Sequence, residues 1–282
     1  MPETVTQEQW RAVRASLART VDRFADLVTA VPAGTRATRH WSVADTAAHV
    51  ASIAWWYSSM VHVDGSVPIP GIRDQLLATT VDTVADLNDV VLGQFTERDP
   101  VVLAQRLRTD IAEVLRVSER LDPATPMTWL GDARVPLAGV LSHLVNELLV
   151  HGWDIARAAR VRWEIPPADA ARFFELFVVG VVHYDYGRLL DTDDPPSERR
   201  VAVEFRSDHT SPVTLVLHRG RVSLEQPRPD NDVRLWFDPA TLCLMLFGRV
   251  SRVRAVLTGR VTVRGRRPWL LPKFLRTVRL PS

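Results

Sequence analysis

Three residues in the first half of the chain could bind one metal ion together: His49, Glu147 and His151. Glu147 and His151 are four residues apart in a predicted helix, so their side chains share one face, roughly 6 Å apart at Cβ. His49 lies on another predicted helix and shares its apolar stripe with Ile53. Two helices of one bundle can bring such groups to a common point. Spacing alone leaves an alternative open, in which these are surface or hydrogen-bonded bundle residues.

This set of ligands predicts a particular chemistry. Two imidazoles and one carboxylate suit a first-row divalent ion. We expect zinc, although nickel or iron could bind to the same three side chains. Three protein ligands leave a coordination position open, which is typical of catalytic rather than structural sites. An open position could polarise a substrate oxygen, or acidify a bound water or thiol.

Two further polar residues lie near this predicted site on the same helix. Asp154 follows His151 by three residues and could orient its ring, or it could be a surface carboxylate paired with Arg157 or Arg160. His143 precedes Glu147 by four residues, and we expect it to be a solvent-side neighbour, with a position behind the ligands as the alternative. No catalytic or cofactor-binding residue is assigned beyond these.

The elements that would position these residues follow from helical periodicity. Apolar residues recur at steps of three and four in four long segments, which predicts a four-helix bundle. Ser42 is a good N-cap for the second segment, with Asp45 three residues on, where a carboxylate can reach back to the cap. Pro136 is expected in the first turn of the fourth. The predicted helices span about 10–31, 42–64, 101–121 and 136–160, and a broken helical stretch covers 72–96.

The pattern changes after Pro166 and Pro167, which indicate a domain boundary. We therefore predict two domains, 1–165 and 166–282, and a fold of class α plus α/β. One helix is expected over 168–190. Alternating residues then predict short strands, and Arg219-Gly220 predicts a hairpin turn between two of them. The predicted strands are 201–205, 213–218, 221–225, 233–237 and 260–263, and the predicted helices among and after them are 239–247 and 270–278.

Composition limits the classes of protein to consider. The 282 residues are 46% hydrophobic, with a net charge of +2. No apolar run approaches the roughly 18 residues of a membrane span. The N-terminus is polar and acidic, unlike a secretory signal, so we expect a cytoplasmic protein.

Cysteine and arginine usage add two expectations. Cys243 is the only cysteine, which excludes an internal disulfide and a thiolate-rich zinc site, and we expect a buried core thiol. We expect the C-terminal arginines to lie on a solvated surface, with an anion-binding site as the alternative. No nucleic-acid recognition motif accompanies them, so nucleic-acid binding is not expected. These arginines are Arg249, Arg252, Arg254, Arg260, Arg264, Arg266 and Arg267.

Two segments resemble a known family. The stretch from Trp41 to His49, and the stretch Asn146-Glu-Leu-Leu-Val-His-Gly-Trp-Asp-Ile-Ala156, resemble the second-helix and fourth-helix signatures of the DinB-like, mycothiol-dependent maleylpyruvate isomerase N-terminal domain. This resemblance implies that His49, Glu147 and His151 are the metal ligands. The stretches 238–249 and 257–265 resemble an SCP2-like domain, which implies a small α+β unit after the bundle.

The resemblance also implies a function. In this family, zinc is thought to hold the thiolate of mycothiol, an actinobacterial thiol, which adds to an electrophilic carbon and later leaves. We therefore expect a metal-dependent and mycothiol-dependent isomerase or transferase that acts on a small electrophile, as a monomer or homodimer. Because Cys243 is poorly placed to serve as the nucleophile, the thiol would come from outside.

Other functions remain open. The chain could be a thiol-independent metalloenzyme, such as a hydrolase, cyclase or lyase of a biosynthetic pathway, or a non-catalytic module that binds an apolar ligand in its SCP2-like half. Maleylpyruvate is a dianion, so arginines should neutralise it in an isomerase. The candidates are Arg249, Arg252, Arg254 and Arg73.

Overall fold

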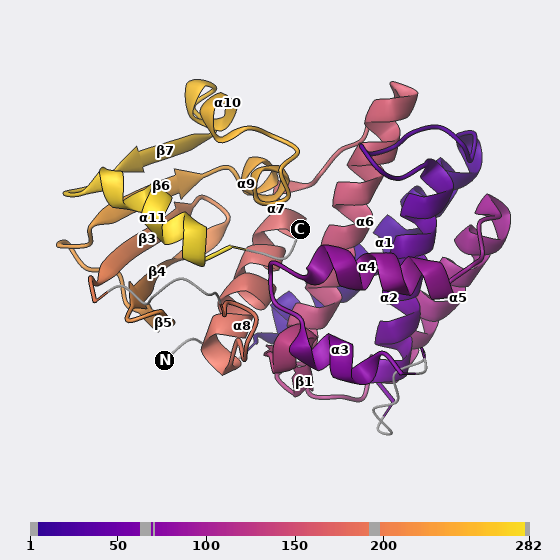
Figure 1. The fold of residues 1–282 in the computed structure, drawn as a ribbon, viewed down its shortest axis with the longest axis horizontal. Helices are drawn as coiled ribbons and strands as arrows, with labels where there is room; N and C mark the ends of the chain where they lie inside the picture. The colour runs from indigo at the N-terminus through magenta and orange to yellow at the C-terminus, as the bar shows by residue number, and fades with distance from the viewer. Residues whose placement is uncertain (1–4, 63–68, 70, 192–197, 280–282) are drawn as a thin grey trace.

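The chain forms a helical N-terminal part followed by an α/β C-terminal part (Figure 1). The computed structural model describes residues 5–62, 69, 71–191 and 198–279. Both α1 and α2 pack against both α5 and α6, which makes the predicted four-helix bundle. These helices are α1 (Gln7–Ala30), α2 (Val43–Met60), α5 (Pro100–Ser118) and α6 (Leu137–Ala159).

The helix that carries His49 begins where the sequence predicts. The Ser42 hydroxyl accepts a hydrogen bond from the Asp45 backbone N–H at 3.1 Å, and the Asp45 carboxylate accepts one from the Ser42 backbone N–H at 3.1 Å. This reciprocal pair satisfies two backbone donors that the first turn leaves free. It places His49 nearly two turns into α2.

The start of α6 differs from the prediction. Pro136 is the N-cap, with extended backbone (φ −61°, ψ 148°), rather than a residue of the first helical turn. It ends strand β2 (Arg134–Pro136), which pairs with β1 (Pro126–Thr128) in a small hairpin that the sequence pattern did not indicate. A 3₁₀ turn, η1 (Leu130–Asp132), connects the two strands. The hairpin brings Trp129 beside the bundle.

The broken helical stretch is confirmed as two short helices, α3 (Arg73–Ala78) and α4 (Val84–Gln94). Helix α4 crosses the bundle and contacts α2, whereas α3 lies at one end of the bundle and contacts η1, the 3₁₀ turn before α6 (Figure 1). Their inward residues include Leu76, Val84 and Leu87, which are buried. One wall of the cavity described below comes from these two helices.

The helix predicted over 168–190 is shorter and irregular. It consists of α7 (Pro167–Arg172), a π-helical segment η2 (Phe173–Val178) and α8 (Val179–Tyr184). Asp185 leaves the helix with extended backbone and pairs with Arg134, which ends the helix early. The segment packs on α6 where Gly139 has no side chain; a Cβ there would lie 2.5 Å from the Leu176 carbonyl oxygen.

Five strands form the sheet of the C-terminal part, in the order β5-β4-β3-β6-β7. Only β3 and β6 are parallel among these described pairs. The predicted hairpin turn is confirmed at Arg219 and Gly220, whose φ angles are 53° and 74°. The strands are β3 (Val201–Ser207), β4 (Thr210–His218), β5 (Arg221–Glu225), β6 (Val233–Phe237) and β7 (Val261–Arg264).

The helices of this part pack on the sheet and on the bundle. Helix α7 contacts α9, and the following segment η2 contacts α6, so this irregular helix connects the C-terminal part to the bundle. The division between residues 165 and 166 stays a prediction. The sequence pattern did not predict helix α10. Within the described ranges, no helix is both long and apolar enough to cross a membrane. The helical elements are α9 (Pro239–Leu246), α10 (Arg252–Leu257), η3 (Pro268–Leu270) and α11 (Leu271–Thr277).

Candidate metal centre

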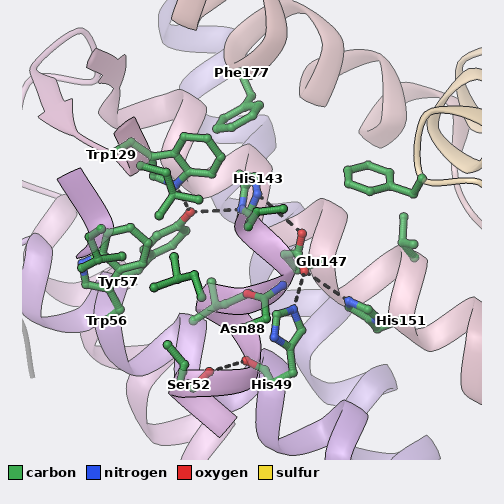
Figure 2. Close-up of a pocket in the computed structure, with 18 of the residues that line it drawn as sticks. His49, Ser52, Trp56, Tyr57, Asn88, Trp129, His143, Glu147, His151 and Phe177 are labelled. Atoms are coloured by element: carbon green, nitrogen blue, oxygen red, sulfur yellow. Dashed lines mark hydrogen bonds and ion pairs between the residues drawn. The ribbon is translucent and has the colours of Figure 1, made fainter. Parts of the chain in front are cut away.

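His49, Glu147 and His151 lie together inside the molecule (Figure 2). The Glu147 Oε2 atom is 3.5 Å from His49 Nε2 and 3.3 Å from His151 Nε2. One nitrogen or oxygen atom from each residue lies within 4.8 Å of the others, and all three side chains are buried. The pairing of α2 with α6 therefore brings the three predicted residues to one point.

The ionisation of Glu147 and of His49 suits a divalent ion. Burial alone would raise the pKa of Glu147, but hydrogen bonds from His151 and His49, with His143 nearby, hold that pKa well below its usual range. Burial lowers the pKa of His49, which favours the neutral imidazole that metals need. Buried carboxylate charge is costly unless a cation or hydrogen bonds compensate it. Burial would lower the pKa of His151, but its contacts with Asp154 and Glu147 raise it above the usual value, so a metal ion competes with a proton for this ring. The donor set and its burial fit a divalent metal ion.

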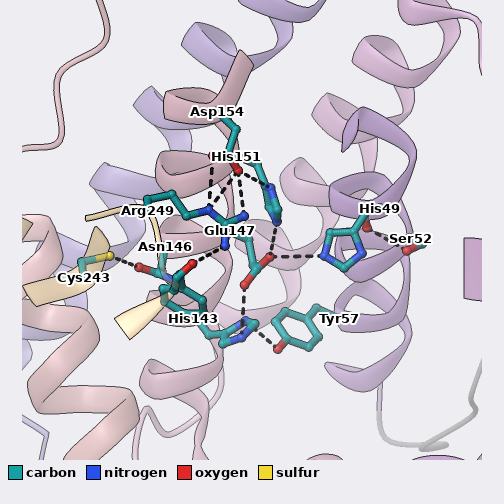
Figure 3. Close-up of polar contacts among 11 residues, drawn as sticks. His49, Ser52, Tyr57, His143, Asn146, Glu147, His151, Asp154, Cys243 and Arg249 are labelled. Carbon is teal, nitrogen blue, oxygen red and sulfur yellow. Dashed lines mark hydrogen bonds and ion pairs between the residues drawn. The ribbon is translucent and has the colours of Figure 1, made fainter. Parts of the chain in front are cut away.

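Asp154 lies behind His151, on the side of the ring away from Glu147. Its Oδ2 atom lies 3.3 Å from His151 Nδ1, and burial of this carboxylate is offset by His151 and Arg249, which keep its pKa low. Of the two expectations for Asp154, the contact with His151 is present. The arginine partner is Arg249, at 2.8 Å from Oδ2, rather than Arg157 or Arg160 (Figure 3). A carboxylate behind a histidine ligand fixes the ring and raises its basicity.

The expectation that His143 is a solvent-side neighbour is wrong, because its side chain is buried. The Trp129 indole N–H donates to the Tyr57 hydroxyl at 2.8 Å, and that hydroxyl lies 3.0 Å from His143 Nδ1. If the hydroxyl donates to Nδ1, the ring proton is on Nε2, which lies 3.5 Å from Glu147 Oε1. This chain of contacts supports the carboxylate oxygen that faces away from His49 and His151.

Sequence reasoning did not single out Tyr57 or Trp129 as site residues. Tyr57 carries a usable signal, since it lies eight residues after His49 on the apolar stripe of α2. Trp129 carries none, because a loop residue has no periodicity to follow and reaches the site only through the unpredicted hairpin.

A cavity that opens to solvent lies over the three residues. Its walls are mostly aromatic and aliphatic. The aromatic side chains come from both ends of α2, from the β1–β2 hairpin, from η2 and from the end of α9, and the aliphatic ones come mainly from α2, α3, α4 and α6. The aromatic residues are Trp41, Trp56, Tyr57, Trp129, Phe173, Phe177 and Phe247.

Of the four arginines considered as substrate contacts, Arg249 lines the cavity. Arg73, Arg252 and Arg254 are exposed and do not contribute to its described lining. The other members of the C-terminal arginine cluster are exposed as well, which confirms the predicted solvated surface except at Arg249. Arg249 follows α9, so the C-terminal part contributes to a site on the bundle.

Cys243 is buried, as predicted. Its Sγ atom lies 2.7 Å from Asn146 Oδ1, and burial, with the Glu147 charge nearby, raises the pKa of the thiol far above its usual range. This cysteine therefore does not supply a thiolate at neutral pH.

The fold and the site define a two-part protein whose helical bundle carries a buried His–Glu–His cluster beside an apolar cavity. Residues 10–156 match the family model of the mycothiol maleylpyruvate isomerase N-terminal domain, and the chain belongs to this family.

Solved structures show the same fold. The crystal structure of a mycothiol-dependent maleylpyruvate isomerase is similar over 89% of this chain and 91% of that one, with 12% identity and a TM-score of 0.50. A histidine-to-alanine mutant of such an isomerase gives the same values. No curated protein sequence matches the chain.

Proposed function

We propose that this protein is a metal-dependent enzyme, with zinc as the expected ion, that uses mycothiol to isomerise or modify a small electrophilic substrate. The observation that carries the proposal is the buried convergence of His49, Glu147 and His151 beside a cavity. Membership of the mycothiol maleylpyruvate isomerase N-terminal domain family supports the use of this thiol.

A divalent ion held by these three side chains would acidify a thiol to the thiolate, which is the nucleophilic form. The chain's own residues prepare the site for this chemistry. Asp154 orients the His151 ring, and His143 supports the outer oxygen of Glu147. The apolar walls exclude water, which protects a thiolate from protonation and a reactive adduct from hydrolysis. Cys243 does not compete, because its thiol is buried and protonated.

Arg249 contributes a guanidinium at the edge of this site. Its Nη2 atom is bound to Asp154 at 2.8 Å, and its Nη1 atom donates to the Phe247 carbonyl oxygen at 2.5 Å. These contacts fix the side chain in place. A fixed guanidinium can orient a carbonyl or carboxylate oxygen of the substrate without paying a large ordering cost.

Metal analysis of the purified protein, followed by calorimetric titration with mycothiol, tests the proposal. We expect about one equivalent of divalent metal per chain, and thiol binding only in the metal-loaded form. His49→Ala and His151→Ala should lose both, whereas His40→Ala, on an exposed loop, should keep both. Full metal content in the first two variants would refute the ligand assignment. Metal without thiol binding would favour the thiol-independent metalloenzyme, and turnover in a thiol-free assay would establish it.

A second cavity supports a further candidate function, binding of an apolar ligand by the SCP2-like C-terminal part. Its lining is apolar apart from Arg279 and the Tyr186 hydroxyl among the described residues, and it includes Phe174, Leu246 and Phe274. Binding of a fluorescent fatty acid that persists in His49→Ala would support this candidate. Absence of binding in both proteins would remove it.

A further inference from the structure

The cavity over the metal centre carries few charges. Among the described residues that line it, Glu147 and Arg249 are the ones whose side chains are charged irrespective of histidine protonation. The Arg249 charge is balanced by Asp154, whose two carboxylate oxygens lie 2.8 to 3.3 Å from Nε and Nη2. Arg249 can therefore orient one substrate carboxylate at most, and the described lining contains no second arginine.

A bound metal ion would leave this balance of charges in the cavity unchanged. This step and the inference that follows rest on the proposed function. The charge of a divalent ion would be offset by the Glu147 carboxylate and by one thiolate. A substrate with two carboxylates would then bury negative charge without a matching cation. Burial of an unpaired carboxylate is strongly unfavourable.

The other side chains that line the cavity favour apolar groups of a ligand. Side chains of α3 and α4 form one wall, with Leu76, Val84, Leu87 and Val91. Asn88 points into the same cavity (Figure 2) and provides an uncharged amide that can bind a carbonyl oxygen. The aromatic rings of the opposite walls offer faces and edges on which flat groups can stack.

We propose that the substrate is an uncharged or singly charged electrophile with an apolar body, rather than a small dicarboxylate such as maleylpyruvate. The apolar body lies against the α3–α4 wall, and the electrophilic carbon faces the His49–Glu147–His151 cluster. Burial of a phenyl-sized group contributes roughly 10- to 100-fold in affinity. The dicarboxylate lacks this contribution and leaves one carboxylate unpaired.

Binding to the metal-free protein, measured without thiol, tests the substrate class separately from turnover, because the described cavity lining then holds no metal charge that could attract a carboxylate. Three probes form a series: benzylideneacetone is uncharged, para-carboxybenzylideneacetone carries one charge, and maleylpyruvate carries two. Quenching of cavity tryptophan fluorescence in the full-length protein gives the Kd of each. We expect both benzylideneacetones to bind at least about tenfold more tightly than maleylpyruvate.

A variant pair on α4 tests whether the wall is responsible. Leu87→Arg places a cation in the cavity, and Val90→Arg places one on the exposed side of the same helix, where Val90 is 38% exposed. Leu87→Arg should weaken benzylideneacetone binding at least about tenfold and strengthen maleylpyruvate binding. Val90→Arg should change neither. If Leu87→Arg does not fold, Leu87→Ala should weaken benzylideneacetone and leave maleylpyruvate unchanged.

The outcomes separate the two proposals. Tighter binding of maleylpyruvate, with mycothiol-dependent turnover, would overturn the substrate class and leave the proposed function intact. Binding of benzylideneacetone without mycothiol-dependent turnover of any probe would count against the proposed function and support the substrate class. Failure of all three probes to bind would overturn the substrate class.

Discussion

The contact between Arg249 and Asp154 joins the C-terminal part to the helix that carries two of the three candidate ligands. The Asp154 side chain is 4% exposed and that of Arg249 is 22% exposed, so water screens this pair poorly. Arg249→Met keeps the side chain's apolar length and removes the guanidinium. The substitution therefore leaves the buried Asp154 carboxylate with one described side-chain partner, His151 Nδ1, at 3.3 Å.

The expected magnitude follows from burial. Removal of one partner from a fully buried ion pair costs about 3–5 kcal/mol, mainly because the other charge stays buried and unpaired. The partial exposure of Arg249 and the remaining contact with His151 reduce this cost. We therefore expect Arg249→Met to lower the free energy of unfolding by about 2–3 kcal/mol. In the double variant with Asp154→Asn, the coupling energy should be about 1–2 kcal/mol.

Urea unfolding of the metal-free protein measures these values, with tryptophan fluorescence and far-ultraviolet circular dichroism recorded together. Coincident transitions are required, since a two-part protein can unfold in more than one step. Arg108→Met is the matched control. Arg108 pairs with Asp26 at 2.6 Å on the surface, and its loss should cost at most about 1 kcal/mol. An Arg249→Met cost no larger than this, or purely additive effects in the double variant, would refute the reasoning.

Three further outcomes are expected. Tyr57→Phe removes the hydroxyl that contacts His143, so the affinity for a divalent ion should fall by about tenfold in a chelator competition assay. The control Tyr184→Phe loses a hydrogen bond to the Ala124 carbonyl oxygen and should leave this affinity unchanged. Cys243 should not react with a thiol-specific disulfide reagent in the folded protein and should react with one equivalent in urea; reaction in the folded state would contradict the burial that raises its pKa. Gly139→Ala forces a Cβ against η2 and should lower the free energy of unfolding by about 1–3 kcal/mol. The control Gly93→Ala, in α4 with open space around it, should raise the free energy of unfolding by up to about 1 kcal/mol. Equal effects of the two substitutions would contradict the packing of α6 against η2.

Local sequence patterns determined most of the elements. The four long helices follow from apolar steps of three and four, and the start of α2 follows from the Ser42–Asp45 pair. The hairpin at Arg219-Gly220 depends on backbone conformations that its own residues favour. The joint position of Glu147 and His151 is likewise local, because a helix places residues four apart on one face.

Local irregularities were harder to predict. The helix predicted over 168–190 contains η2 and ends at Tyr184, because Asp185 pairs with Arg134 and the segment must fit against Gly139 of α6. The hairpin before α6 also escaped prediction. Its strands are three residues each, too short to show a period.

Only the tertiary structure decided how the site is assembled. The approach of His49 to Glu147, the burial of His143 under Trp129 and the pairing of Arg249 with Asp154 all join segments far apart in the sequence. Such contacts depend on how helices cross and on which part of the chain covers which face, and no local pattern encodes these. The sequence by itself determined which side chains could bind a metal ion and which two share a helix face. Packing decided that His49 joins these two residues and that Arg249 of the C-terminal part lies at the edge of the site. Packing also decided that the cavity over the site is lined mostly by apolar side chains.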